Sequence, residues 1–324
     1  MKYKQKLIIL LTTIGVLALA YIFSFIFAPE RMRARTASFS WLDPKLAASA
    51  EKISLRTTGS SIELLKRNGL WVVAQDEQEY PAKQLRADDL IAALTRHASY
   101  PVRTSNASAH ERLGLDEGAA SRITVLGANG TALLDLLLGH GDAAGQDIYM
   151  RKFGSNEVRS GEDKFSAYLF SAVSSWYNLR LVPETEDNRL DIDKVQRLTV
   201  YPGDGAGGSG EQQIFSRRAR QWAFNLIDDA DLDMEKVEAY IRAVLYAEGD
   251  DFSSEIAVND PMLNNSRIII ELGTGDVKTI YLSAALEPEN RRYATVSGTK
   301  FVYSIADWMA GRLFNTADHF KKEE

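Results

Sequence analysis

Four aspartates stand close together in the C-terminal half of the 324-residue chain: Asp228, Asp229, Asp231 and Asp233. Clustered carboxylates are the ligands that hard cations such as Ca²⁺ require. The order typical of an EF-hand is missing, because no glycine stands at the sharp turn and no glutamate at the last ligand position. The aspartates also lead into a predicted helix, whose N-terminal dipole favours negative charge. We therefore predict no metal site here and interpret the four residues as an acidic surface for contact with a partner.

Three other patterns match catalytic or ligand-binding motifs only in part. The glycine-rich run 203–210 lacks the lysine of a phosphate-binding loop and is interpreted as an insertion in a hairpin turn. Ser297 and Lys300 have the spacing of a Ser-x-x-Lys motif, but on a predicted turn instead of a helix start. The histidines lack the four-residue spacing with which a helix holds zinc; they are His97, His110, His140 and His319. We predict no catalytic residue and no cofactor.

The composition excludes several classes of protein. The absence of cysteine excludes disulfides, cysteine-ligated zinc, iron–sulfur clusters, thiol catalysis and a lipidated cysteine. With 45% apolar and 25% charged residues, the chain can bury a core and is not intrinsically disordered. A net charge of -6 disfavours nucleic-acid binding, and the basic cluster Arg217, Arg218 and Arg220 is interpreted as a solvated turn.

The charge is distributed unevenly along the chain. The formal charge is +5 in residues 1–50, -1 in residues 51–182 and -10 in residues 183–324. The basic end surrounds Leu7–Ala28, 22 residues without Asp, Glu, Lys, Arg or His. A helix of that length covers the hydrocarbon core of a bilayer. We predict an uncleaved signal anchor in the cytoplasmic (inner) membrane, with the bulk of the chain extracytoplasmic; a cleaved signal peptide and a buried core helix are the alternatives.

The remaining chain shows an internal repeat. Two predicted strands precede Trp71, and two precede Trp222, at an offset of 151 residues. An amphipathic helix follows in each half, and we align Leu85 with Leu232 at an offset of 147. Repeated units of this size fold as similar supersecondary structures.

Each half then continues with two hairpins and a further helix. Glycine-bearing turns separate short apolar runs in residues 121–158 and again in residues 266–302, which is typical of hairpins. Apolar spacing predicts closing helices over Lys164–Tyr177 and Ile305–Phe314. The predicted fold class is α+β: an N-terminal transmembrane helix followed by two similar repeats of antiparallel hairpins packed with helices.

The predicted boundaries follow from this pattern. They are a tail at 1–6, the anchor at 7–28, a juxtamembrane linker at 29–50, a first unit at 51–182, a linker at 183–189 and a second unit at 190–320.

Several short motifs in the first unit form a recognisable set. They are Leu70–Val73, Arg112–Asp116, Leu138-Gly139, Tyr149–Arg151 and Trp176–Arg180. With the N-terminal anchor, this set resembles the bacterial domain of unknown function 4340 family. Members of that family often occur beside gliding-motility-type ABC transporters. The resemblance implies an anchored accessory subunit and supplies no catalytic residues.

We therefore expect a membrane-anchored, non-enzymatic accessory or scaffold subunit. Its expected partners are the lipid bilayer, through Leu7–Ala28, and a membrane protein such as an ABC transporter subunit. One alternative is an extracytoplasmic ligand-binding module for an envelope glycan or lipid, using a cleft between the two units. Another is a hydrolase with dispersed catalytic residues.

Overall fold

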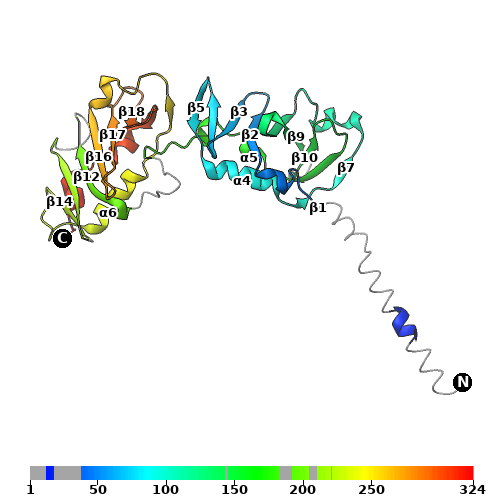
Figure 1. Cartoon of the computed structure of the whole chain (residues 1–324), viewed down its shortest axis with the longest axis horizontal. Helices are drawn as coiled ribbons and strands as arrows, with labels where there is room; N and C mark the ends of the chain where they lie inside the picture. Colours follow the sequence, from blue (N-terminus) through cyan, green and yellow to red (C-terminus); the bar gives the residue numbers. More distant parts are fainter. Residues whose placement is uncertain are drawn as a thin grey trace, which may run out of the picture. The chain divides into compact units, whose positions relative to one another are not determined.

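The computed structural model describes residues 12–17, 38–142, 145–182, 192–203, 210–219 and 221–323 (Figure 1). The predicted anchor Leu7–Ala28 lies outside these residues except for 12–17, which are helical, and the predicted linker 183–189 lies outside them entirely. In the described part of the chain, no helix is both long enough and apolar enough to cross a membrane.

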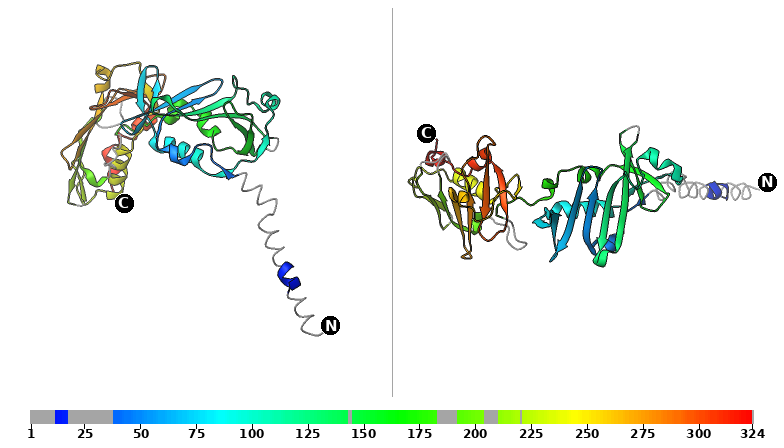
Figure 2. Two further views of the ribbon diagram at one scale, coloured as in Figure 1. Left: turned by 45° about the vertical axis from the view of Figure 1, so that its right-hand side comes forward. Right: turned by 90° about the horizontal axis from the view of Figure 1, so that it is seen from above.

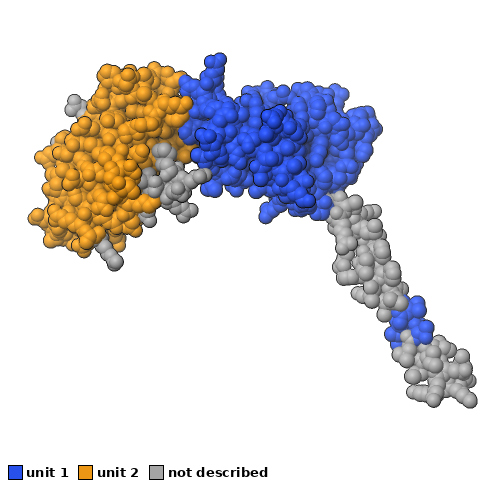
Figure 3. All heavy atoms as spheres, viewed as in Figure 1, with its two compact units in different colours: residues 1–176 blue, residues 177–324 orange. Residues whose placement is uncertain are grey.

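The chain divides into two compact units, residues 1–176 and residues 177–324 (Figure 3). The division falls six residues before the predicted end of the first unit at residue 182. The intervening segment belongs to the second unit because the Leu181 N–H donates to the Ala247 carbonyl at 2.9 Å and Arg180 pairs with Glu248 at 3.6 Å.

The first unit is built on a nine-stranded antiparallel sheet with the order β5-β4-β3-β2-β8-β9-β10-β11-β7. The strands are β2 (Ala50–Arg56), β3 (Ser61–Arg67), β4 (Leu70–Gln75), β5 (Gln78–Pro81), β7 (Val102–Thr104), β8 (Ser121–Gly127), β9 (Ala132–Gly141), β10 (Asp147–Lys152) and β11 (Val158–Glu162). Helix α4 (Gln84–Thr95) packs on one face (Figure 2). The smaller elements are α3 (Pro44–Ala47), α5 (Ser166–Leu169) and the pair β1 (Ser38–Phe39) with β6 (Ala98–Ser99).

The second unit is built on an eight-stranded antiparallel sheet with the order β14-β13-β12-β16-β17-β18-β19-β15. The strands are β12 (Val195–Tyr201), β13 (Gln213–Arg218), β14 (Gln221–Phe224), β15 (Asp251–Ser253), β16 (Ser266–Leu272), β17 (Val277–Leu282), β18 (Arg291–Val296) and β19 (Val302–Ala306). The helices are α6 (Met234–Leu245) and α7 (Asp307–Gly311). The predicted α+β class is therefore confirmed, with two large antiparallel sheets and few helices.

The two sheets share one strand order, apart from the extra edge strand β5 in the first unit. The register of the first hairpin is also the same: Trp71 stands opposite Lys66, and Trp222 stands opposite Arg217. In both hairpins the cation lies over the indole ring, at 5.5 Å and 5.8 Å from the ring centroid. The sequence offset of 151 thus matches equivalent ladder positions.

The helix alignment at an offset of 147 is wrong. Leu85 is 80% exposed, whereas Leu232 is 1% exposed and lies before α6 begins. The buried positions of the two helices coincide at an offset of 150, which places Leu90 with Tyr240 and Leu94 with Val244. Buried spacing, and not the identity of one leucine, therefore defines the helical register.

The two predicted closing helices are also wrong in extent. The segment Lys164–Tyr177 forms only the short helix α5 and a 3₁₀ turn at Val173–Trp176, since the Ser171 and Ser175 hydroxyls bind nearby carbonyls and compete with regular helix. The segment Ile305–Phe314 begins as β19 and becomes helical only at Asp307.

A 3₁₀ turn closes the core of each unit. The N–H of Lys83, just before α4, donates to the carbonyl of Trp176 at 2.8 Å. The N–H of Asp233, just before α6, donates to the carbonyl of Phe320 at 2.9 Å. The Trp176 and Phe320 side chains are fully buried, and the Phe320 ring contacts the rings of Phe215, Phe224 and Tyr240.

Part of the opposite face of the first sheet, around β9 and β11, is covered by a loop that contains the 3₁₀ turn Glu111–Leu113. Gly139 of β9 allows this close approach, because a Cβ atom there would collide with the carbonyl oxygen of Leu113. Leu115 then packs with Leu137 and Val158 in a small buried cluster.

We expect Gly139→Ala to lower the free energy of unfolding by about 2 kcal/mol, because overpacking displaces either the loop or the strand. Gly59→Ala is the matched control, since no atom lies within 4 Å of the added Cβ. Denaturant unfolding of the two variants measures the difference. Equal stabilities would show that the loop does not depend on this contact.

Candidate functional site

The four predicted contact aspartates lie on the segment between β14 and α6 of the second unit. Asp233 is the N-cap of α6: its carboxylate accepts hydrogen bonds from the backbone N–H groups of Glu235 and Lys236, at 3.0 Å and 3.2 Å. This bonding satisfies helix donors that would otherwise lack partners. Asp233 therefore has a structural role in addition to its charge.

Asp229 also has a local partner. Its carboxylate lies 3.7 Å from the guanidinium of Arg218, and both side chains are mostly exposed. The first unit has an ion pair at the corresponding place, where Arg67 and Glu79 approach to 2.7 Å. Exposed pairs of this kind add little stability. Because both units have this ion pair at the edge of the sheet, the pairing of Asp229 is a feature of the shared fold and is not specific to the second unit.

Asp228 and Asp231 present exposed side chains. The segment that carries them is held by its backbone, because the N–H of Asp231 donates to the Asp228 carbonyl and the Lys322 N–H donates to the Asp231 carbonyl. Their carboxylates thus remain in solvent on a fixed turn, as an interaction surface requires.

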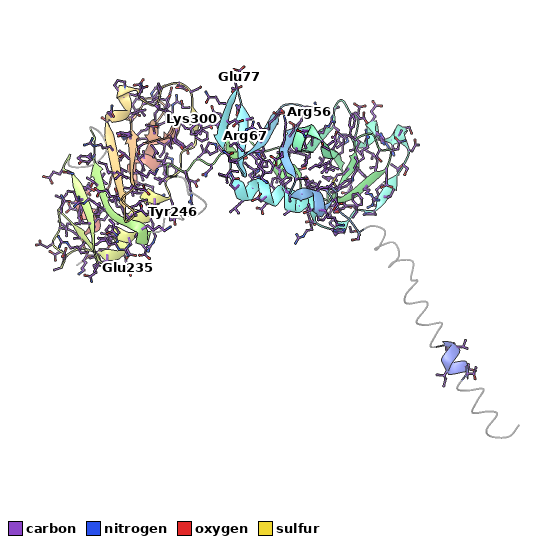
Figure 4. All side chains as sticks on the ribbon, viewed as in Figure 1. Arg56, Arg67, Glu77, Glu235, Tyr246 and Lys300 are labelled. Atoms are coloured by element: carbon purple, nitrogen blue, oxygen red, sulfur yellow. The ribbon has the colours of Figure 1, made fainter. Side chains whose placement is uncertain are left out.

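A pocket of about 500 Å³ opens beside this segment. Asp229 and Asp233 line it, whereas Asp228 and Asp231 do not. The other charged lining residues are Arg218, Glu235 and Lys322. Glu235 is exposed at the beginning of α6 (Figure 4). The structure thus brings two of the four predicted residues together with cations that the sequence pattern did not associate with them.

A smaller pocket of about 280 Å³ lies in the first unit and is lined by Tyr100, Asp147, Glu162 and Lys164. Burial raises the pKa of the Tyr100 hydroxyl, so this group is protonated at neutral pH. Asp147 is 3.6 Å from Arg103 and accepts a hydrogen bond from the Ser160 hydroxyl. These polar groups satisfy one another, which is typical of a structural network.

The remaining sequence motifs do not converge. Ser297 lies in the β18–β19 turn, where its hydroxyl accepts the N–H of Thr279. His110 lies near the Asn156 carbonyl, and His319 packs on Phe320. In the described residues, no group of three or more His, Asp or Glu side chains could hold a metal ion. Most of the glycine-rich run 203–210 lies outside those residues.

One cluster that the sequence analysis missed lies in the second unit. The Tyr293 hydroxyl donates to Glu255, and Arg291 donates to both oxygens of the same carboxylate at 3.0 Å and 3.3 Å. The hydrogen bond from Tyr293 is the main reason that the pKa of Glu255 lies below its usual value, and the nearby Arg291 adds to the effect. Because Glu255 is 36 residues from Arg291 in sequence, no spacing rule relates them.

A buried cation joins two of the first unit's short motifs. Arg151 is 3% exposed, and its guanidinium donates to the Leu115 carbonyl at 2.9 Å and 3.1 Å and to the Ser155 carbonyl at 3.0 Å. Glu117 supplies the opposing charge at 3.3 Å. The Tyr149–Arg151 motif therefore holds the loop that contains the Arg112–Asp116 motif.

Comparison with protein families agrees with this arrangement. The model of a domain of unknown function, DUF4340, matches residues 71–261, more than half of the chain. The chain therefore belongs to that family. The match begins in β4 and ends in the second unit before β16, so that it covers parts of both sheets. No curated protein and no solved structure matches the chain.

We expect Asp233→Ala to lower the free energy of unfolding by about 1 kcal/mol, the usual effect of removing a helix N-cap. Asp228→Ala removes an equal charge from the same segment without removing a cap, and its effect should stay within about 0.5 kcal/mol. Denaturant unfolding compares the two. A loss of the same size in both would mean that local charge, not capping, determines stability here.

We expect Tyr293→Phe to raise the pKa of Glu255 toward the usual value of about 4.3. NMR titration of the Glu255 carboxyl carbon measures this, with Tyr281→Phe as a control within the same apolar cluster. Because the folded-state pKa is depressed, the stabilisation is present above the unfolded pKa and is lost as the pH falls through the folded pKa. An unchanged titration of Glu255 in Tyr293→Phe would contradict the assignment of that hydrogen bond.

Proposed function

We propose that the chain is a membrane-anchored, non-enzymatic accessory or scaffold subunit of the cytoplasmic membrane that works with an ABC-type transporter complex. The anchor is the apolar segment Leu7–Ala28, and the bulk of the chain is extracytoplasmic. The transporter context comes from the family resemblance. In this proposal the two sheets are tandem copies of one unit, an interpretation supported by their shared strand order.

The observation that carries the proposal is the negative charge of the second unit. Residues 183–324 have a formal charge of -10, against -1 in residues 51–182. A shared fold does not require this difference, because Asp228 and Asp231 have exposed side chains that neither cap a helix nor line the pocket. Charge of one sign on a surface speeds association with a partner of the opposite sign.

Crosslinking of the full-length chain in native membranes tests the partner. We expect transporter subunits among the crosslinked proteins, recovered about fivefold less with the variant Asp228→Asn/Asp229→Asn/Asp231→Asn, which corresponds to roughly 1 kcal/mol of electrostatic attraction. The expected loss decreases as salt rises, because exposed charges are screened.

A matched variant in the first unit controls for net charge. Glu77, Asp89 and Glu111 are also exposed acids, so Glu77→Gln/Asp89→Asn/Glu111→Gln removes the same charge elsewhere. This variant should retain wild-type recovery. Reproducible recovery of no transporter subunit with the wild-type chain would refute the proposal, and equal losses in both variants would refute the role of the acidic segment.

A further inference from the structure

At the outer edge of β14, the Trp222 main-chain groups have no backbone partner among the described residues. The N–H of Asn225 donates to the Ile214 carbonyl at 3.1 Å, which makes that opposed pair a hydrogen-bonded one. Bonded and non-bonded pairs alternate along an antiparallel ladder. Three steps further along the register, Trp222 opposite Arg217 is therefore a non-bonded pair. Its N–H and C=O point away from β13, toward the outer edge of the sheet.

The first unit shows what such an edge binds. Trp71 occupies the same ladder position, and the side chain of Gln84 bonds to both of its main-chain groups. The Gln84 carboxamide accepts the Trp71 N–H at 2.7 Å and donates to the Trp71 carbonyl at 2.9 Å. A carboxamide has the same donor and acceptor as a peptide group.

The second unit lacks this carboxamide. Gln84 is the first residue of α4, and the first residue of α6 is Met234, whose thioether cannot donate a hydrogen bond. Among the described residues, no side chain replaces the Gln84 carboxamide at Trp222. Instead, Trp222 and Met234 both line the pocket of about 500 Å³, a volume within the usual range for ligand sites.

The strand order supplies a second, independent observation. In the first unit β5 pairs with β4, at Val72 with Pro81 and at Val73 with Tyr80, and forms the ninth strand. In the second unit Ile227 bridges Phe224 at the end of β14, and the segment that corresponds to β5, residues 228–231, then turns away and leaves β14 at the edge beside Trp222. The second sheet thus has eight strands and a pocket beside its edge.

We propose that this pocket binds an extended peptide segment of a partner protein, whose main chain pairs with Trp222 and adds a ninth strand to the second sheet. Strand addition uses main-chain hydrogen bonds for affinity and flanking side chains for specificity. Lys322 and Glu235 line the pocket beside the Arg218–Asp229 ion pair, so the charged lining provides contacts for peptide side chains of either sign. This site does not depend on whether the partner belongs to a transporter.

Solution NMR of the uniformly ¹⁵N-labelled full-length chain tests the site. The probes are the capped tetrapeptide acetyl-Thr-Val-Thr-Val-amide and N-methylacetamide, the smallest peptide group. We expect the tetrapeptide to shift the Trp222 backbone amide resonance in a saturable way. The Trp71 amide resonance should stay unchanged, because the Trp71 N–H already donates to the Gln84 carboxamide. N-methylacetamide should shift the same resonance only weakly.

The variant Met234→Gln is designed to fill the site internally, as Gln84 does in the first unit. It should weaken the tetrapeptide's apparent affinity about tenfold, the effect of losing one or two neutral hydrogen bonds. Its melting temperature should equal or exceed that of the wild type. Met262→Gln, on the 3₁₀ turn Pro261–Asn264 and outside the pocket lining, makes the same exchange and should bind as the wild type does.

The outcomes separate clearly. No saturable shift at Trp222 would overturn the proposal, as would equal affinity in Met234→Gln and the wild type. A larger response to N-methylacetamide than to the tetrapeptide would assign the pocket to a small carboxamide ligand and overturn the peptide. If Met234→Gln fails to fold, slower hydrogen exchange of the wild-type Trp222 amide in the presence of tetrapeptide supports the site, and unchanged exchange overturns it.

Discussion

Each unit depends on one backbone hydrogen bond that joins its end to the residue before its main helix. A single helix of 12 residues cannot cover one face of a sheet of eight or nine strands. The chain therefore returns after its last strand and places Trp176 or Phe320 over the remaining apolar surface. Beyond Trp176 the chain packs in the second unit, where the Leu181 N–H donates to the Ala247 carbonyl.

The four aspartates before α6 differ in whether their carboxylates have a partner within the fold. The Asp233 N–H donates the closing hydrogen bond to Phe320, and the Asp233 carboxylate caps α6, so both groups are engaged within the fold. Asp229 repeats an ion pair that the first unit also has. The exposed carboxylates of Asp228 and Asp231 neither cap a helix nor line the pocket. Two of the four aspartates, Asp229 and Asp233, therefore have partners within the fold, and the other two, Asp228 and Asp231, have carboxylates exposed for contact with a partner.

The sequence predicted the features that depend on local pattern. Short apolar runs before each tryptophan identified the strands around Trp71 and Trp222, and the structure places these two residues at equivalent ladder positions. The helix alignment failed because it matched two leucines, Leu85 and Leu232, of which only one is buried. The closing helices failed because serine hydroxyls and a longer β19 competed with helical spacing.

The roles of Arg151 and Gln84 could not be predicted from local pattern, since each depends on contacts between segments far apart in sequence. Arg151 reaches a loop 36 residues away.

Because the two units share one strand order, each serves as a control for the other. Features present in both, such as the cation over the indole ring and the closing bond, are requirements of the fold. Features present in only one unit are not required by the shared fold. The second unit exchanges Gln84 for Met234 at the helix start and has no strand equivalent to β5.

Both changes affect the same strand edge, although they lie on different segments of the chain. An uncovered edge invites aggregation, and proteins usually protect such an edge. The second sheet retains the remaining strand order without these two covers, which supports our proposal that an external strand pairs with this edge.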